Sequence, residues 1–274
     1  MSPGTGLARA VDRYGDLVER TSTAAACLFC GERGSSREDV FALWISALFA
    51  AATPFALKTT AGRNKTDLVK FAVYSRAACV DCNTGWMSSL EQNVKPLLSP
   101  ALFGQHVAWD ADEQLLVAAW AFKTGLMLDR SNLTAQKVPL AHFRYLRDHQ
   151  RPPDASQVSL GVYRPDPGQP HQGATAGVGA GPESHRDSYR ISFSVGQAVF
   201  VVHGHAGDGR AFQVQQSSVL PSRLWVPLWN TLPCLWPRTA TVFRWPPPDG
   251  FALNNDSLER LSDNPLMEPF LIRP

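Results

Sequence analysis

The sequence has no hydrophobic run long enough to cross a membrane, and no large excess of charge of either sign. A membrane helix needs about 20 consecutive apolar residues. The longest candidate, residues 40–55, is shorter and contains Trp44, Ser46, Thr53 and Pro54. The formal net charge of +2 neither indicates nor excludes a nucleic-acid partner. We expect no association with a membrane, and DNA remains a candidate partner.

The N-terminal segment lacks the apolar centre of a secretory signal. Residues 1–19 contain Asp12, Asp16 and Glu19, whereas an export signal has an uninterrupted apolar stretch after a basic start. We therefore expect a soluble, cytoplasmic protein. In a reducing compartment, closely spaced pairs of cysteines indicate a metal site more often than disulfides.

Cysteines are few, but four of the five form two pairs with the same spacing. Cys27 and Cys30 form the first pair, Cys79 and Cys82 the second, and 48 residues separate the pairs. A two-residue spacer lets both thiolates of a turn face one tetrahedral ion. The alternative is a buried disulfide or inert core thiols. We predict one structural Zn²⁺ bound by all four, a closed site with no position for a reacting water.

The chain divides into four regions by composition and hydrophobic period, and the expected fold class is α+β. Residues 1–24 read as an N-terminal arm, 25–100 as the zinc module, 110–150 as a helical connector and 155–274 as a β-rich region. Within the module, Ser35 or Ser36 is a candidate cap for a helix leading into the apolar run 40–45. Residues 58–67 read as a loop. A second helix is expected from Thr84 to Asn93, ended by Pro96 and Pro100.

The later regions show the two hydrophobic periods clearly. An acidic cap at Asp110 or Asp112 precedes a helical pattern that reaches Met127, and Pro139 opens a second helix with Phe143 and Leu146 inward. Apolar residues then alternate at 158–162 and 191–195, and residues 198–202 form a continuous apolar run, which predicts strands. Residues 212–214 and 242–245 are expected to extend this sheet, and residues 256–261 to form a short helix. The Pro- and Gly-rich stretch 164–188 predicts a mobile loop.

Three segments carry a resemblance to a known family. They are CLFCG at 27–31, EDVFALW at 38–44 and CVDCNTGWMSSLE at 79–91. Together they are similar to a bacterial subgroup of zinc-containing HNH endonucleases, in which CxxCG precedes an EH-x-FPxW segment and a CxxCNxGWMSxLE segment. The resemblance covers residues 25–98. Weaker features of the subgroup are WAFKTG at 120–125 and the Trp-Pro dipeptides at 236 and 245.

The resemblance implies a ββα-metal core of treble-clef type, in which a catalytic Mg²⁺ or Mn²⁺ lies beside the structural zinc. Glu38 falls at the first position for a ligand of the catalytic ion and Asn83 at the last. Asp39 falls where the family has its general-base histidine. The implied activity is hydrolysis of DNA phosphodiester bonds, with the ion stabilising charge on the scissile phosphate.

Two departures from the family pattern bear on activity. Histidine titrates near neutral pH, whereas an aspartate with a pKa of about 4 is a poor proton acceptor at pH 7. The proline of the family is replaced by Ala42. Glu38 and Asp39 also fit the first turn of a helix, where carboxylates interact favourably with the helix dipole. Asn83 equally fits a helix cap.

Three functions therefore stay open from the sequence. The first is a divalent-metal-dependent endonuclease acting on DNA through Glu38, Asp39 and Asn83. The second is a zinc-stabilised binding or scaffold protein that has lost this chemistry. The third is an enzyme of the same fold acting on a small molecule, held against the C-terminal region rich in tryptophan.

Overall fold

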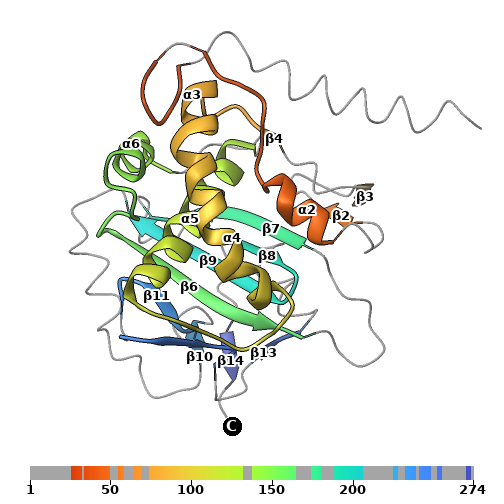
Figure 1. Ribbon diagram of the computed structural model, residues 1–274. Coiled ribbons are helices and arrows are strands. Elements are labelled where there is room, and N and C mark those ends of the chain that lie inside the picture. The colour runs from red at the N-terminus through yellow and green to blue at the C-terminus, as the bar shows by residue number, and fades with distance from the viewer. Residues whose placement is uncertain are drawn as a thin grey trace, which may run out of the picture.

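The computed structural model describes residues 26–32, 34–49, 55–58, 65–68, 74–131, 138–164, 174–180, 188–205, 225–227, 232–238, 241–247, 252–254 and 270–272. It is an α+β fold, as predicted, in which helices cross one face of an antiparallel sheet (Figure 1). No described helix combines the length and the hydropathy that a membrane crossing requires. The expected N-terminal arm, a strand at 212–214 and a helix at 256–261 lie outside the described residues.

The main sheet has the strand order β11-β6-β9-β8-β7. Its strands are β6 (Ser156–Tyr163), β7 (Ala174–Ala180), β8 (Ser188–Val195), β9 (Ala198–His205) and β11 (Cys234–Trp236), and β13 (Ala252–Leu253) pairs with β6 in parallel. The β6–β9 register runs from Ser156 opposite Gly204 to Val162 opposite Ala198. The predicted strands at 158–162, 191–195 and 198–202 are confirmed.

Helix α5 (Ala111–Ser131) lies directly on this sheet. A Cβ atom at Gly125 would meet Val202 at 3.4 Å and Ile191 at 3.5 Å, so the helix and strands β8 and β9 approach closely. Asp110 caps the helix as predicted: its Oδ1 accepts from the backbone N–H groups of Asp112 at 2.9 Å and Glu113 at 3.0 Å. Glu113 Oε2 accepts in turn from the Asp110 N–H at 2.9 Å, which completes a capping box.

The second connector helix also agrees with its sequence pattern. Helix α6 (Leu140–His149) follows Pro139 and buries Phe143 and Leu146, while Arg144 and Arg147 face solvent. One hydrophobic cluster extends from Cys27 and Phe29 through α5 and α6 to the sheet and on to Trp245. The three predicted regions that follow the arm therefore share a continuous core.

The helix after the second cysteine pair begins earlier and ends later than predicted. It consists of α3 (Val80–Cys82), a π-helical turn η1 (Asn83–Met87) with non-helical backbone at Gly85, and α4 (Ser88–Leu102). Pro96 and Pro100, expected to end the helix, lie inside α4. An internal proline costs about 3 kcal/mol. Burial of an apolar stripe at four-residue spacing offsets this cost; its members are Leu90, Val94, Leu98 and Leu102.

The segment around the acidic pair is also organised differently. Glu38 and Asp39 form strand β1 (Glu38–Asp39), antiparallel to β4 (Tyr74–Ser75), rather than the first turn of a helix. The backbone of Glu38 pairs with that of Ser75, and the backbone of Asp39 with that of Tyr74. Both acidic residues are therefore in extended conformation. The apolar run becomes helical only from Leu43, in α2 (Leu43–Leu48).

Three stretches predicted as loops or as sheet extensions differ in the structure. Parts of 58–67 belong to a hairpin of β2 (Phe55–Lys58) and β3 (Lys65–Leu68), because ladder hydrogen bonds do not require apolar side chains. The stretch 164–188, predicted as a mobile loop, contains the edge strand β7, which pairs with β8. β12 (Phe243–Trp245) pairs with β5 (Val107–Trp109) instead of extending the main sheet. A fourth small pair joins β10 (Trp225–Pro227) to β14 (Phe270–Ile272).

Candidate metal centre

The two cysteine pairs meet in space. The sulfur atoms of Cys27, Cys30, Cys79 and Cys82 all lie within 4.8 Å of one another, and Cys30 Sγ and Cys79 Sγ are 3.6 Å apart. Four sulfurs at about 2.3 Å from a tetrahedral zinc ion would be about 3.8 Å apart, whereas a disulfide needs about 2.05 Å. All four thiols are free. The four cysteines therefore lie close enough to bind a metal ion such as zinc.

Backbone hydrogen bonds shape each turn and join the two. Gly31 N–H donates to the Cys27 carbonyl at 2.8 Å, and Gly31 has a φ of +84°, a conformation that glycine adopts without strain. The turns are tied together by Leu28 N–H donating to Ala77 O at 2.9 Å and Ser36 N–H donating to Ala78 O at 2.8 Å. The backbone alone thus holds segments from the two cysteine pairs side by side.

The cysteine sulfurs are partly buried, and backbone N–H groups donate hydrogen bonds to the Cys27 sulfur. Burial raises the pKa of the Cys27 thiol, but backbone hydrogen bonds from Cys30, Cys79 and Phe29 outweigh burial and bring this pKa to about 7. Burial raises the pKa values of Cys30 and Cys82. A divalent cation favours the thiolate form of its ligands. The four sulfurs are therefore suited to bind zinc as thiolates.

Aromatic contacts connect the first cysteine turn to two helices. The ring of Phe29 meets Trp86 edge-on at 5.4 Å between centroids and Phe143 of α6 at 5.2 Å. Phe29 is 1% exposed. The metal centre consequently packs into the core that reaches α6 and the sheet.

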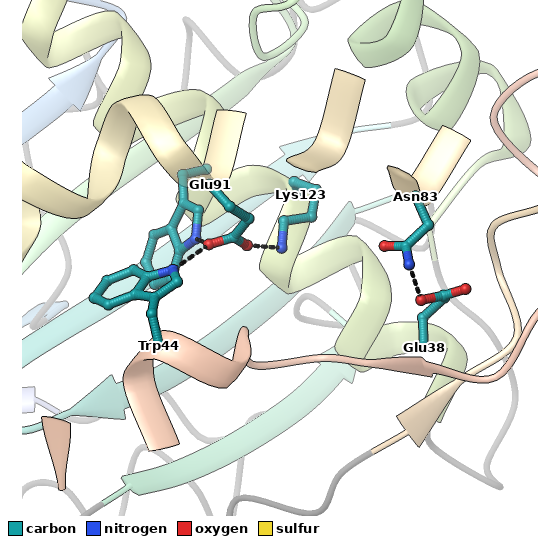
Figure 2. Close-up of polar contacts among 6 residues, drawn as sticks. Glu38, Trp44, Asn83, Glu91 and Lys123 are labelled. Atoms are coloured by element: carbon teal, nitrogen blue, oxygen red, sulfur yellow. Dashed lines mark hydrogen bonds and ion pairs between the residues drawn. The ribbon is translucent and has the colours of Figure 1, made fainter. Parts of the chain in front are cut away.

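Glu38 and Asn83 lie opposite each other, as Figure 2 shows. Asn83 follows Cys82 directly and donates from Nδ2 to Glu38 Oε2. Ser36 Oγ donates to the other carboxylate oxygen. Glu38 is buried, and burial raises the pKa of its carboxyl group, with a smaller contribution from the charge of Asp39; the hydrogen bonds from Ser36 and Asn83 oppose this rise. Asn83 is not the N-terminal cap of this helix, because Cys79 holds that position.

Asp39 belongs to different surroundings from Glu38. Alternation along an extended strand places adjacent side chains on opposite faces. Asp39 lies opposite Tyr74 in the register, and the Arg37 guanidinium stacks 3.8 Å from the centroid of the Tyr74 ring. Burial raises the pKa of Asp39, and the positive charge of Arg37 opposes that rise. The structure therefore brings Glu38 and Asn83 together and leaves Asp39 on the Arg37 side of the strand.

A buried polar group to which no sequence motif assigned a role lies nearby, and we call it the Glu91 cluster. Glu91 Oε2 accepts from the indole N–H groups of Trp44 at 2.8 Å and Trp120 at 2.9 Å, and Glu91 Oε1 accepts from Lys123 Nζ at 2.5 Å. The side chains of Lys123 and Glu91 are 5% and 14% exposed. The only available signal was that Trp44, Glu91, Trp120 and Lys123 all fall in segments that share the family resemblance.

The chain matches no protein-family model, no curated protein and no solved structure. Function is therefore inferred from the side chains themselves. Chemically, the site combines a closed set of four sulfurs with a buried carboxylate and an amide at its edge. The sulfurs can hold a structural ion, and the two oxygen-bearing groups are of the kind that binds a hard divalent cation.

Proposed function

We propose that this protein is a divalent-metal-dependent endonuclease of HNH type that hydrolyses DNA phosphodiester bonds on a zinc-held ββα module. The observation that carries the proposal is the contact between Glu38 and Asn83. These residues are 45 positions apart in sequence, at the two positions where the resemblance expects ligands of the catalytic ion. The order of β1, β4 and the helix that begins at Val80 also supports a ββα arrangement.

The residues present fit a hard divalent cation. Mg²⁺ and Mn²⁺ prefer carboxylate and amide oxygens as ligands. Asn83 donates a hydrogen bond to Glu38 through Nδ2, which leaves the amide oxygen Oδ1 of Asn83 available as a ligand for a cation. When bound, such an ion would stabilise negative charge on a phosphoryl group and its leaving oxygen. Ser36 fixes the Glu38 carboxylate from the other side. A zinc ion bound by four sulfurs would have a structural role only, because it has no open position for a reacting water.

A second candidate function rests on the position of Asp39. The residue that replaces the general-base histidine lies opposite Tyr74 in the strand register and feels the charge of Arg37, and strand alternation places it on the other face from Glu38. A carboxylate in that environment is a weaker proton acceptor near pH 7 than histidine. This favours a zinc-stabilised nucleic-acid-binding protein with little or no cleavage activity.

Plasmid nicking with Mg²⁺ or Mn²⁺ separates the two candidates. If the protein is an endonuclease, the zinc-loaded chain nicks plasmid, and Asn83→Ala lowers the rate on the order of 100-fold, as loss of a preorganised group does at other sites. The matched control is Gln92→Ala on the exposed side of the same helix, which should cleave like the parent.

The variant Asp39→His restores the histidine of the family pattern and makes the same nicking assay more decisive. A parent that binds DNA without nicking it, and gains cleavage on this substitution, would establish the binding protein. Absence of cleavage from pure, zinc-loaded parent with every divalent ion would refute the endonuclease.

A further inference from the structure

The Glu91 cluster links three elements near the Glu38–Asn83 pair. Trp44 comes from α2, Glu91 from α4, and Trp120 and Lys123 from α5. Both oxygens of the carboxylate are engaged, and its charge is balanced by the buried ammonium group of Lys123. Figure 2 shows the cluster with Lys123 between Glu91 and the Glu38–Asn83 pair. A buried charge that is paired and fully hydrogen-bonded fixes geometry, because every other arrangement leaves a charge without compensation.

The cluster and the Glu38–Asn83 pair join the same two stretches of chain. Glu38 and Trp44 lie on one stretch, Asn83 and Glu91 on the other, and the two contacts run in the same order along both. The helix between Asn83 and Glu91 contains the non-helical backbone of Gly85. A contact on the far side of this interruption would oppose relative movement of the two stretches.

Helix α2 needs such a contact. It has six residues, no side-chain cap, and neither an acidic residue in its first turn nor a basic one in its last. Helices this short are not stable by themselves in water. Strand β1, which carries Glu38, precedes α2 by three residues and pairs with only two residues of β4. Glu38 is therefore held in part through α2, together with the buried Val40 and Phe41 that lie between them.

We propose that Glu91 is a positioning residue: anchored to α5 by Trp120 and Lys123, it holds Trp44 and thereby keeps Glu38 opposite Asn83. Because α5 lies on the sheet, the polar chain from Lys123 through Glu91 to Trp44 transmits the rigidity of the sheet to the short strand at the metal centre. The inference rests on the proposed function in one respect: Glu38 and Asn83 are taken to be the working pair.

The test uses the side-chain amide signal of Asn83 in the zinc-loaded full chain, measured by two-dimensional NMR. The signal is assigned by its loss in Asn83→Ala, and its position without the carboxylate is given by Glu38→Ala. Trp44→Phe keeps an aromatic ring but removes the N–H donor to Glu91. The matched control is Trp245→Phe, because the buried Trp245 indole N–H has no hydrogen-bond partner in the part of the chain that the structure describes.

We expect Trp44→Phe to move the Asn83 signal at least halfway toward its position in Glu38→Ala, and Trp245→Phe to leave it in place. If Trp44→Phe fails to load zinc, the double variant Glu91→Leu/Lys123→Met decides, since it removes the buried charge and its partner together. An Asn83 signal that stays in its parental position in the folded variants overturns the inference.

Plasmid nicking by the same variants keeps the inference and the proposed function apart. If the parent is active, Trp44→Phe should lower kcat at least ten-fold and leave the KM for DNA unchanged, because DNA contacts are not altered. If the parent is inactive, the proposed function fails, and the NMR signal still decides whether Glu91 positions the pair. Lower kcat with an unmoved Asn83 signal would also contradict the inference.

Discussion

The zinc module and the main sheet are held together in opposite ways. Strands β6 and β9 have eight residues each, and nearly every one is buried. In the module, β1 pairs with β4 over only two residues. Phe29 and Phe41 join it to the shared core, and four sulfurs, backbone hydrogen bonds between turns and the Glu91 cluster add further links. The sheet is therefore stabilised by apolar burial along whole strands, whereas we expect the module to depend more on a bound ion and on polar contacts. The module should respond to metal and the sheet should not.

Removal of zinc should have the largest effect, and it should be local. Structural zinc contributes on the order of 10 kcal/mol in small modules. We expect chelation to abolish hydrogen-exchange protection of the amides around Cys27 to Gly31 and Ala77 to Asn83, while β6, β8 and β9 stay protected. Zinc added back should restore the pattern. Equal loss of protection in the sheet would remove the distinction between the two regions.

Truncation of a sheet residue should, in contrast, weaken both regions. Phe200 is fully buried, stacks on Phe193 at 5.1 Å and meets Trp120 of α5 edge-on at 5.4 Å. Phe200→Ala should lower the free energy of unfolding by about 3–5 kcal/mol and release zinc at a lower urea concentration. The control is Leu43→Ala on an exposed residue of α2, which should change stability by less than about 0.5 kcal/mol. Unchanged zinc release in Phe200→Ala would show that the module is independent of the sheet.

Acid should weaken the junction between α6 and the sheet. His142 is buried and shares a hydrogen bond of 2.7 Å with Tyr189 OH. Burial, and secondarily the charge of His205, lowers the pKa of His142 to about 4, below its value of about 6.5 in the unfolded chain. The fold therefore disfavours the charged imidazole. The neutral imidazole therefore contributes to the free energy of unfolding. This contribution is complete above pH 6.5 and is lost as the pH falls toward 4, by up to about 3 kcal/mol.

Urea unfolding at several pH values tests this junction. His142→Gln should remove the part of the acid dependence between pH 6.5 and 4, whereas His106→Gln, at an exposed position, should keep it. An identical pH slope in the parent and His142→Gln would mean that other groups cause the acid sensitivity.

The smallest expected effect concerns the start of α5. Asp110→Ala removes the acceptor of two backbone N–H groups and should cost about 1 kcal/mol. Asp112→Ala, two residues later and exposed, should cost less than half of that. Thermal unfolding of the two variants provides the measurement. Equal losses would mean that the capping box does not determine where this helix begins.

The parts of the fold that follow from local chemistry could be predicted from the sequence. The spacing of the cysteines predicted that the sulfurs meet, Asp110 predicted the start of α5, and the apolar runs predicted β6, β8 and β9. These features depend on residues close together or on a strong period. Prediction failed where distant pairing decides local structure, as for Glu38 and Asp39, which β4 holds in a strand.

The candidate site was predictable only in part, for a related reason. Motif positions brought Glu38 and Asn83 into consideration, and the structure places them in contact. Asp39 is separated from Glu38 and Asn83 because adjacent residues of a strand lie on opposite faces. The sequence pattern predicted a helix for this segment and therefore did not predict the separation. The partners of Glu91 come from three elements, and no sequence spacing indicates that two tryptophans and a lysine converge on one carboxylate.

X-ray absorption at the zinc edge of the purified full chain tests the account most directly. We predict one zinc per chain with four sulfur neighbours at about 2.3 Å and no oxygen or nitrogen neighbour. Substitution of Cys82 by serine should change this first shell. A zinc-free protein that keeps its fold, or a spectrum with fewer than four sulfurs, would contradict a closed tetrahedral centre and the placement of Glu38 and Asn83 that depends on it.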